Sequence, residues 1–130
     1  MIVALRTAGL IGLAILLSCA TAAQAAERPL KGPEIDALIK GNTVTGQDIS
    51  GVWKQFFDAN GETVYVAGSK PPSRGAWNVQ GDKFCSQWPP NEAWTCYVVT
   101  GDLDAKPRTV TWISGGGTKY PGAVQVGNGL

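Results

Sequence analysis

The pattern of apolar and polar positions divides the chain into three stretches. Residues 8–17 form an uninterrupted apolar run. A second stretch places Ile35, Leu38 and Ile39 at positions i, i+3 and i+4, which is the spacing of one face of a helix. After Gly41 the pattern changes to period two, and turn residues recur about every eight to twelve positions. This alternation predicts short antiparallel strands with one buried and one solvated face.

The expected helix is short and has recognisable ends. Pro33 suits a first helical position, and Glu34 and Asp36 follow where the helix dipole favours carboxylates. Lys40 and Gly41 are typical of a helix C-terminus. Because one apolar stripe over about two turns does not stabilise an isolated helix, we expect it to dock on the end or open face of a sheet.

The expected strands are short and are separated by turns rich in glycine, proline, asparagine and aspartate. They cover residues 52–57, 63–67, 76–79, 83–87, 94–100, 108–114 and 123–126. Roughly seven or eight short strands predict a mainly β fold, either a small antiparallel barrel or a sandwich arranged as a lipocalin-like meander. We expect a single β-rich domain over residues 33–130, with residues 26–32 as a flexible lead-in.

One hairpin is predicted with its register. If residues 88–93 form its loop, Cys85 lies directly opposite Cys96, and Phe84 lies opposite Tyr97 on the other face. Cysteines at such a cross-strand position are close enough to be bridged. The spacing is not that of a C-x-x-C redox motif, and we expect a structural disulfide.

The N-terminus predicts export. Arg6 is the only charged residue before Glu27, the apolar run follows it, and Ala23-Gln24-Ala25 fits the pattern read by signal peptidase. We expect a signal peptide over residues 1–25. The apolar run is shorter than the roughly 20 residues of a membrane-spanning helix, so we expect no permanent transmembrane anchor. The alternative is lipidation of Cys19, which would give a membrane-anchored lipoprotein.

Composition narrows the chemistry. The chain has 130 residues, 11 basic and 10 acidic side chains, and no histidine. Lysine and arginine residues are scattered singly along the chain. The sequence therefore lacks the cluster of basic residues that is typical of nucleic-acid-binding proteins. The segment from Gly101 to Asp104 lacks the later glycine and glutamate of a calcium loop. We therefore expect no metal, no cofactor and no enzymatic activity.

Several short motifs resemble a group of small exported alphaproteobacterial proteins of unknown function. They are Gly41-Asn42-Thr43-Val44, Phe57 with Gly61, Gly75-Ala76-Trp77-Asn78-Val79, Cys85, Trp88-Pro89 and Cys96-Tyr97. The likeness runs from about Pro33 to Val99. It implies export, a β-rich fold and the disulfide, and it brings no catalytic residues, because the group has none established.

Five tryptophans are the most informative excess in the composition. Trp53, Trp77 and Trp112 lie in expected strands, which predicts core positions. In the alternative of a carrier, these three residues and Val64 would line an internal cavity.

Trp88 and Trp94 flank Pro89 and Pro90 at the tip of the predicted disulfide hairpin. They pack as a lid over one barrel end or form a rigid aromatic platform for a partner, with Tyr97 and Tyr120 supplying polar contacts nearby. We expect an exported, non-catalytic binding domain, secreted or periplasmic, whose partner is a protein or a small apolar ligand. The alternatives are a secreted effector or virulence-associated protein that is translocated into a host cell, and a lipocalin-like carrier of a small apolar ligand.

Overall fold

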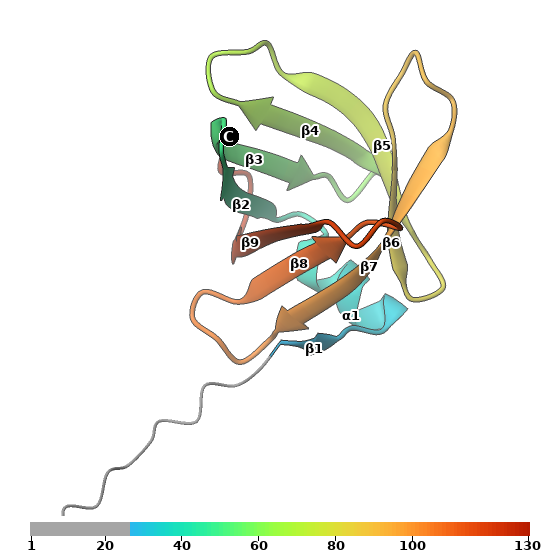
Figure 1. Cartoon of the computed structure of the whole chain (residues 1–130), viewed down its shortest axis with the longest axis vertical. Coiled ribbons are helices and arrows are strands. Elements are labelled where there is room, and N and C mark those ends of the chain that lie inside the picture. Colours follow the sequence, from blue (N-terminus) through green and yellow to red (C-terminus); the bar gives the residue numbers. More distant parts are fainter. Residues whose placement is uncertain (1–26) are drawn as a thin grey trace, which may run out of the picture.

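The computed structural model describes residues 27–130, which form one helix and a nine-stranded antiparallel sheet (Figure 1). The predicted signal peptide and Cys19 lie outside the described residues. Within residues 27–130, no helix has the length and apolar character that crossing a membrane requires. The elements are β1 (Arg28–Pro29), α1 (Gly32–Ile39), β2 (Thr43–Asp48), β3 (Gly51–Phe57), β4 (Glu62–Ala67), β5 (Ser73–Gln80), β6 (Lys83–Gln87), β7 (Trp94–Asp102), β8 (Thr109–Ile113) and β9 (Lys119–Gln125).

Strands β2 to β9 close into a barrel. Each pairs with the next along the chain, and β9 pairs back onto β2 with Val124 opposite Val44. Closure gives each of these eight strands a neighbour on both sides, although the C-terminal part of β7 extends beyond β6. The predicted mainly β fold is confirmed as an eight-stranded up-and-down barrel with one extra strand, and the sandwich alternative is wrong.

The strand β2 was not among the expected strands. Its sequence is mostly polar, and the apolar alternation that reveals a strand is reduced to Val44, which is fully buried. Two positions further, Gly46 leaves room for Trp53, because a Cβ atom there would lie 2.1 Å from the indole ring. A glycine that makes room for a neighbouring ring is not counted as an apolar position, so the alternation typical of a strand is not visible here.

The expected flexible lead-in, residues 26–32, is described from residue 27 onward, and within it Arg28–Pro29 pair into the sheet as β1. Arg28 pairs with Gly101 in β1, and the backbone N–H of Leu30 donates a 2.9 Å hydrogen bond to the carbonyl of Val99. Leu30 is 2% exposed and joins the core. The segment docks because β7 extends beyond β6 and offers unpaired backbone groups at that point. A strand of two residues is too short to produce a recognisable pattern in the sequence.

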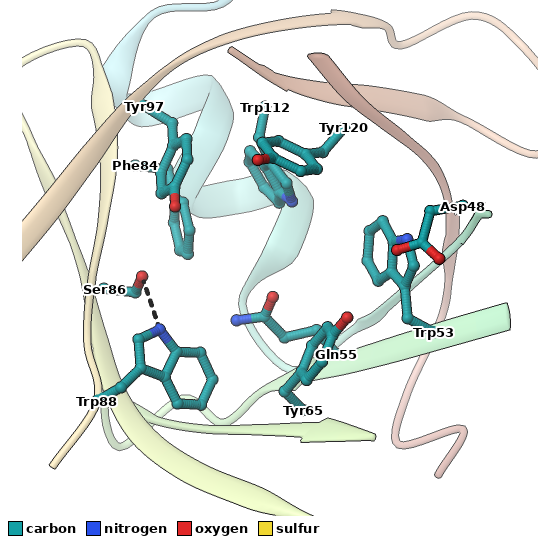
Figure 2. A pocket seen from close by; sticks show the side chains of 10 residues that line it. All are labelled: Asp48, Trp53, Gln55, Tyr65, Phe84, Ser86, Trp88, Tyr97, Trp112 and Tyr120. Carbon is teal, nitrogen blue, oxygen red and sulfur yellow. Dashed lines mark hydrogen bonds between the residues drawn. The ribbon is translucent and has the colours of Figure 1, made fainter. Parts of the chain in front are cut away.

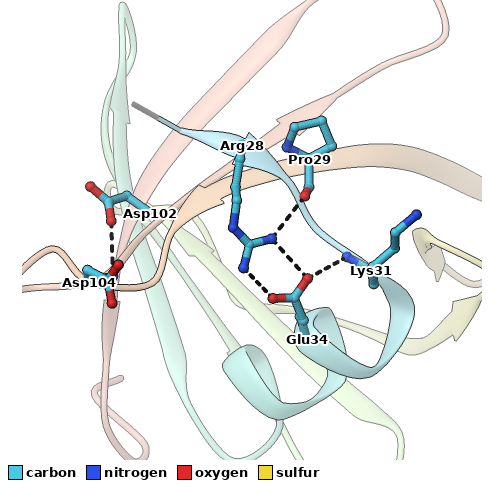
Figure 3. A network of polar contacts seen from close by, with 6 residues as sticks. All are labelled: Arg28, Pro29, Lys31, Glu34, Asp102 and Asp104. Carbon is cyan, nitrogen blue, oxygen red and sulfur yellow. Dashed lines mark hydrogen bonds and ion pairs between the residues drawn. The ribbon is translucent and has the colours of Figure 1, made fainter. Parts of the chain in front are cut away.

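A small polar network holds this segment to the helix (Figure 3). The Arg28 guanidinium pairs with the Glu34 carboxylate, and one nitrogen also donates to the carbonyl of Pro29 at 3.2 Å. The backbone N–H of Lys31 donates to Glu34 at 3.1 Å, as in a capping box. Glu34 therefore serves two purposes, because it caps α1 and anchors β1.

The helix α1 closes one end of the barrel. Its predicted apolar stripe is confirmed, since Ile35, Leu38 and Ile39 are all buried. The backbone N–H of Gly41, at a φ of 73°, donates to the carbonyl of Phe57 at 2.7 Å. Positive φ is readily adopted by glycine, which explains the residue that ends the helix.

The predicted hairpin of β6 and β7 is confirmed with its register. Cys85 lies opposite Cys96, and Phe84 lies opposite Tyr97. The two cysteines form a disulfide with a Cα–Cα distance of 4.0 Å. The Phe84 and Tyr97 rings stack on the other face, with centroids 6.1 Å apart.

Aromatic side chains fill the barrel next to the helix. Phe57 is fully buried, and its ring centroid lies 5.8 Å from that of Trp77, 5.5 Å from Phe84 and 6.0 Å from Trp112. This cluster makes the helix-covered end of the barrel solid. The interior beyond it, toward the other end, is hollow.

Candidate ligand cavity

A cavity of about 290 Å³ opens at the barrel end opposite α1 (Figure 2). It lies between the Phe84–Trp112 layer and the turn that joins β2 to β3. Seven of its ten lining residues are aromatic. The lining residues are Asp48, Trp53, Gln55, Tyr65, Phe84, Ser86, Trp88, Tyr97, Trp112 and Tyr120.

One wall of the cavity is built by Trp53, Tyr65 and Trp88. Trp53 and Tyr65 stack with centroids 6.1 Å apart, and Tyr65 meets Trp88 edge to face at 6.3 Å. The three come from β3, β4 and the segment after β6. Strand periodicity explains the placement, because Trp53 and Gln55 are two residues apart and face the same side of β3.

The facing wall is built by Phe84, Trp112, Tyr97 and Tyr120. Phe84 stacks on Trp112 with centroids 4.5 Å apart, and Tyr97 meets Tyr120 edge to face at 6.3 Å. Phe84 and Trp112 are buried, whereas Tyr120 is exposed. The cavity therefore has a buried floor and an open mouth.

Trp88 lines the cavity although it is the first residue after the end of β6. Its indole N–H donates a 3.2 Å hydrogen bond to the Ser86 hydroxyl (Figure 2). Its ring lies against the backbone of Gly75, where a Cβ atom would come within 2.7 Å of the ring. Gly75 and Ser86 together hold the indole over the barrel interior.

The floor of the cavity carries an unpartnered polar group. The Trp112 side chain is 5% exposed, and its indole N–H has no hydrogen-bond partner among the described residues. Figure 2 shows this nitrogen on the cavity side of the ring. An unsatisfied buried donor destabilises a fold by about 1–3 kcal/mol, and such groups are rare. The ring of Trp112 therefore lines the cavity, and its buried N–H lacks an acceptor among the described residues.

Gln55 is the second polar group in the interior. Its amide nitrogen donates a 3.0 Å hydrogen bond to the Thr63 hydroxyl, which in turn donates to the carbonyl of Phe56 at 2.8 Å. This chain fixes the amide so that its oxygen points into the cavity (Figure 2). The cavity floor therefore offers one donor and one acceptor in an aromatic surrounding.

The pKa values of three cavity residues, Asp48, Tyr65 and Tyr97, are shifted away from neutrality. Hydrogen bonds from the Ser50 hydroxyl and backbone N–H lower the pKa of Asp48. Burial raises the pKa of Tyr65, and the nearby Asp48 charge adds to this increase. Burial likewise raises the pKa of Tyr97, with a smaller contribution from Tyr120. At neutral pH Asp48 is ionised, and Tyr65 and Tyr97 are protonated.

The structure separates the residues predicted to line a cavity. Trp53 and Trp112 line it. Trp77 lies deeper, and its indole N–H donates a 2.9 Å hydrogen bond to the carbonyl of Asp58. Val64 precedes Tyr65 in β4 and therefore faces the opposite side of the sheet. Of the four residues expected to line a cavity, Trp53 and Trp112 belong to the lining of this one, and Val64 and Trp77 do not.

The residues predicted to form one platform at the hairpin tip are also separated. Trp88 and Tyr97 line the cavity, whereas Trp94 is 40% exposed on the outside of the barrel. Pro89 and Pro90 are exposed in the loop. Trp88 and Trp94 do not form a joint surface, because Ser86 directs Trp88 inward.

The sequence analysis did not predict five of the lining residues as part of a site, namely Asp48, Gln55, Tyr65, Phe84 and Ser86. A signal for several of them was present, because residues spaced by two along one strand share a face. Once Trp53 is placed inside, Gln55 follows; once Phe84 is placed inside, Ser86 follows. The sequence pattern does not show which face of each strand points into the barrel.

Comparisons with protein-family models, with curated proteins and with solved structures found no match for this chain. The resemblance to small exported alphaproteobacterial proteins therefore stays a prediction. Within residues 27–130, no three histidine, cysteine, aspartate or glutamate side chains are grouped so that they could hold a metal ion.

Proposed function

We propose that this protein is an exported, non-catalytic carrier or binding protein that holds a small, largely apolar organic molecule inside its barrel. The observation that carries the proposal is the unpartnered indole N–H of Trp112 on the floor of an aromatic cavity. A ligand with one hydrogen-bond acceptor would satisfy this donor and cover the apolar rings around it.

The size and construction of the cavity support a small ligand. Its volume of about 290 Å³ is at the lower end of the range typical of ligand pockets, about 300–1,000 Å³. Its walls belong to strands of a closed barrel and pack ring against ring. Preformed walls reduce the conformational entropy lost on binding.

The protonation states support binding in preference to catalysis. General acid–base catalysis works best with a group whose pKa is close to the working pH. In this cavity the pKa of Asp48 is lowered and the pKa values of Tyr65 and Tyr97 are raised, so these groups move away from neutrality. The chain also has no histidine.

Two features support export. The N-terminal residues have the charge, the apolar run and the Ala23-Gln24-Ala25 sequence of a cleavable signal. The Cys85–Cys96 disulfide suits an oxidising compartment outside the cytosol. The alternatives of a host-cell effector and of a lipoprotein anchored through Cys19 stay predictions.

The proposal is tested with a matched pair of small probes. Acetophenone offers a carbonyl acceptor on an aromatic body, and ethylbenzene has a similar body without an acceptor. In NMR titrations of ¹⁵N-labelled protein, we expect acetophenone to shift the indole resonance of Trp112, assigned with Trp112→Phe, and to bind about tenfold more tightly than ethylbenzene. The indole resonance of Trp77, already hydrogen-bonded to Asp58, serves as the internal control. Absence of any shift with both probes would contradict a ligand cavity.

A further inference from the structure

The charge distribution of the cavity points to the class of ligand. Of the ten lining residues, all within the described part of the chain, Asp48 is the one that carries a formal charge at neutral pH. The carboxylate lies at the mouth beside Trp53, with one oxygen turned toward the indole (Figure 2). No lysine or arginine belongs to the lining.

The negative charge of Asp48 is held in place by its own turn. Ser50 donates from its hydroxyl and, at 2.8 Å, from its backbone N–H to the same carboxylate oxygen. These bonds lower the pKa of Asp48 and fix its side chain relative to β2 and β3. The mouth of the cavity therefore carries a fixed anion at neutral pH.

Two basic side chains, Lys70 and Arg74, lie outside the cavity lining. Lys70, in the loop between β4 and β5, makes the smallest of the contributions that lower the pKa of Asp48. Arg74 lies in a separate depression on the far side of Tyr65 and Trp88. Neither residue neutralises the carboxylate from within the cavity.

The aromatic walls favour the same sign of charge. The face of an aromatic ring is electron-rich and attracts a cation placed over it, most strongly for tryptophan and tyrosine. Six of the seven aromatic lining residues are of these two types. A cluster of such rings with a carboxylate at its edge is the arrangement by which proteins recognise substituted ammonium groups.

Building on the proposed function, we infer that the ligand is a small organic cation. Its substituted ammonium group would lie among the aromatic rings near Asp48, and an uncharged acceptor atom of the same molecule would reach the N–H of Trp112. A ligand of this kind would interact both with the Asp48 carboxylate at the mouth and with the unpartnered N–H of Trp112 on the floor. A neutral ligand would use the donor alone.

The test compares two molecules of the same shape. Acetylcholine carries a quaternary ammonium and an ester acceptor, and 3,3-dimethylbutyl acetate replaces the ammonium by an uncharged tert-butyl group. We expect acetylcholine to bind at least about tenfold more tightly in calorimetric or NMR titrations at low salt. Because the mouth is exposed, this preference should decrease as sodium chloride is raised.

Substitutions locate the effect. Asp48→Asn keeps an acceptor for Ser50, and we expect it to weaken acetylcholine binding about threefold to tenfold and to leave 3,3-dimethylbutyl acetate unchanged. Asp104→Asn, in the connection between β7 and β8 at the opposite barrel end, is the matched control and should change neither affinity. An unchanged preference in Asp48→Asn would overturn the role given to this carboxylate.

The outcomes separate this inference from the proposed function. If both esters bind equally, or if only the uncharged ester binds, the cavity is a ligand site and the inference of a cation is overturned. If neither ester binds but acetophenone does, the inference is again overturned and the proposed function stands. If none of these probes binds, both fail.

Discussion

The indole N–H of Trp88 donates a 3.2 Å hydrogen bond to the hydroxyl of Ser86, two residues earlier in the chain. Trp88, the first residue after β6, lies on the same inward side as Phe84 and Ser86, and its ring joins Tyr65 in the cavity wall. Trp94, at the other end of the same loop, has no such partner among the described residues and lies outside. Two tryptophans that look equivalent in the sequence therefore have different surroundings.

The first prediction follows from this difference. Trp88→Ala should weaken acetophenone binding about tenfold or more, because it removes a large aromatic surface that the ligand would cover. Trp94→Ala is the matched control, and its affinity should be that of the unchanged protein. NMR titration gives both affinities, and urea unfolding shows that both variants are folded. Equal effects of the two substitutions would contradict the assignment of Trp88 to the cavity.

The second prediction concerns the indole N–H groups of Trp77 and Trp112. Trp77 and Trp112 are both 5% exposed, but only Trp77 has a partner, the carbonyl of Asp58 at 2.9 Å. Trp77→Phe removes one of two hydrogen bonds to that carbonyl, which also accepts from the backbone N–H of Gly61 at 3.1 Å, whereas Trp112→Phe removes a donor that is already unpartnered. We expect Trp77→Phe to lower the free energy of unfolding by about 1 kcal/mol more than Trp112→Phe does. Urea denaturation of the two variants measures this difference, and a larger loss in Trp112→Phe would contradict it.

Much of this fold can be predicted from local sequence patterns. The helix was predicted from Ile35, Leu38 and Ile39, and the hairpin register from the opposition of Cys85 and Cys96; both signals involve neighbours along the chain or across one turn. The strand β2 and the extra strand β1 were missed because their positions depend on distant partners. Trp53 fills the space at Gly46, and the free edge of β7 receives Arg28.

The candidate site could be predicted only in part, because its residues also meet through contacts between distant parts of the chain. Alternation shows that Val64 and Tyr65 face opposite sides of a strand, but not which side is internal. The carrier alternative predicts that Val64 is on the internal side. In this barrel Tyr65 is internal, because its ring packs between Trp53 and Trp88. An aromatic cavity reverses the usual assignment of the more apolar face to the interior, and hydrophobicity then misleads.

The third prediction tests the fit of Trp53 against β2. Gly46→Ala places a Cβ atom 2.1 Å from the Trp53 ring and 2.7 Å from the carbonyl oxygen of Pro121, so the ring or the strand must move. We expect a loss of about 1–3 kcal/mol in the free energy of unfolding. Gly115→Ala is the matched control, because a Cβ atom there meets nothing within 4 Å. Gly115→Ala should unfold at nearly the urea concentration of the unchanged protein, and equal stability of the two variants would contradict the packing described for Gly46.

The fourth prediction concerns the disulfide. Cys85 and Cys96 are 11 positions apart, and closing a loop of this length restricts the unfolded chain by about 3 kcal/mol in the chain-entropy account. The double substitution of both cysteines by alanine should lower the free energy of unfolding by about 2–4 kcal/mol. Urea denaturation measures the loss, and the unchanged protein with reductant should approach the variant. Intact mass after alkylation of the native protein supplies the control, since alkylation of Cys85 or Cys96 without reductant would contradict the bridge.

The fifth prediction concerns acid stability and the ion pair that holds β1 to α1. The Arg28 side chain and the backbone N–H of Lys31 lower the pKa of Glu34 from its usual 4.5 to about 2 in the folded protein. A carboxyl whose pKa is lower in the folded state stabilises the fold above its unfolded pKa, and this contribution is lost as pH falls through the folded pKa. The part of the stability that depends on Glu34 should therefore decrease between about pH 4.5 and pH 2.

The Glu34→Gln variant isolates this contribution from that of the other carboxylates. Glutamine still accepts the N–H of Lys31 but has no charge for Arg28, so its urea midpoint should fall less than that of the unchanged protein between these pH values. Glu92→Gln, in the exposed loop after β6, is the matched control and should follow the unchanged protein. Because the ion pair is partly exposed, the difference between Glu34→Gln and the unchanged protein should shrink in high salt. Parallel pH profiles for all three proteins at low salt would show that Arg28 and Glu34 do not act as a pair in solution, and that β1 is held by its backbone pairing with β7 and by Leu30 alone.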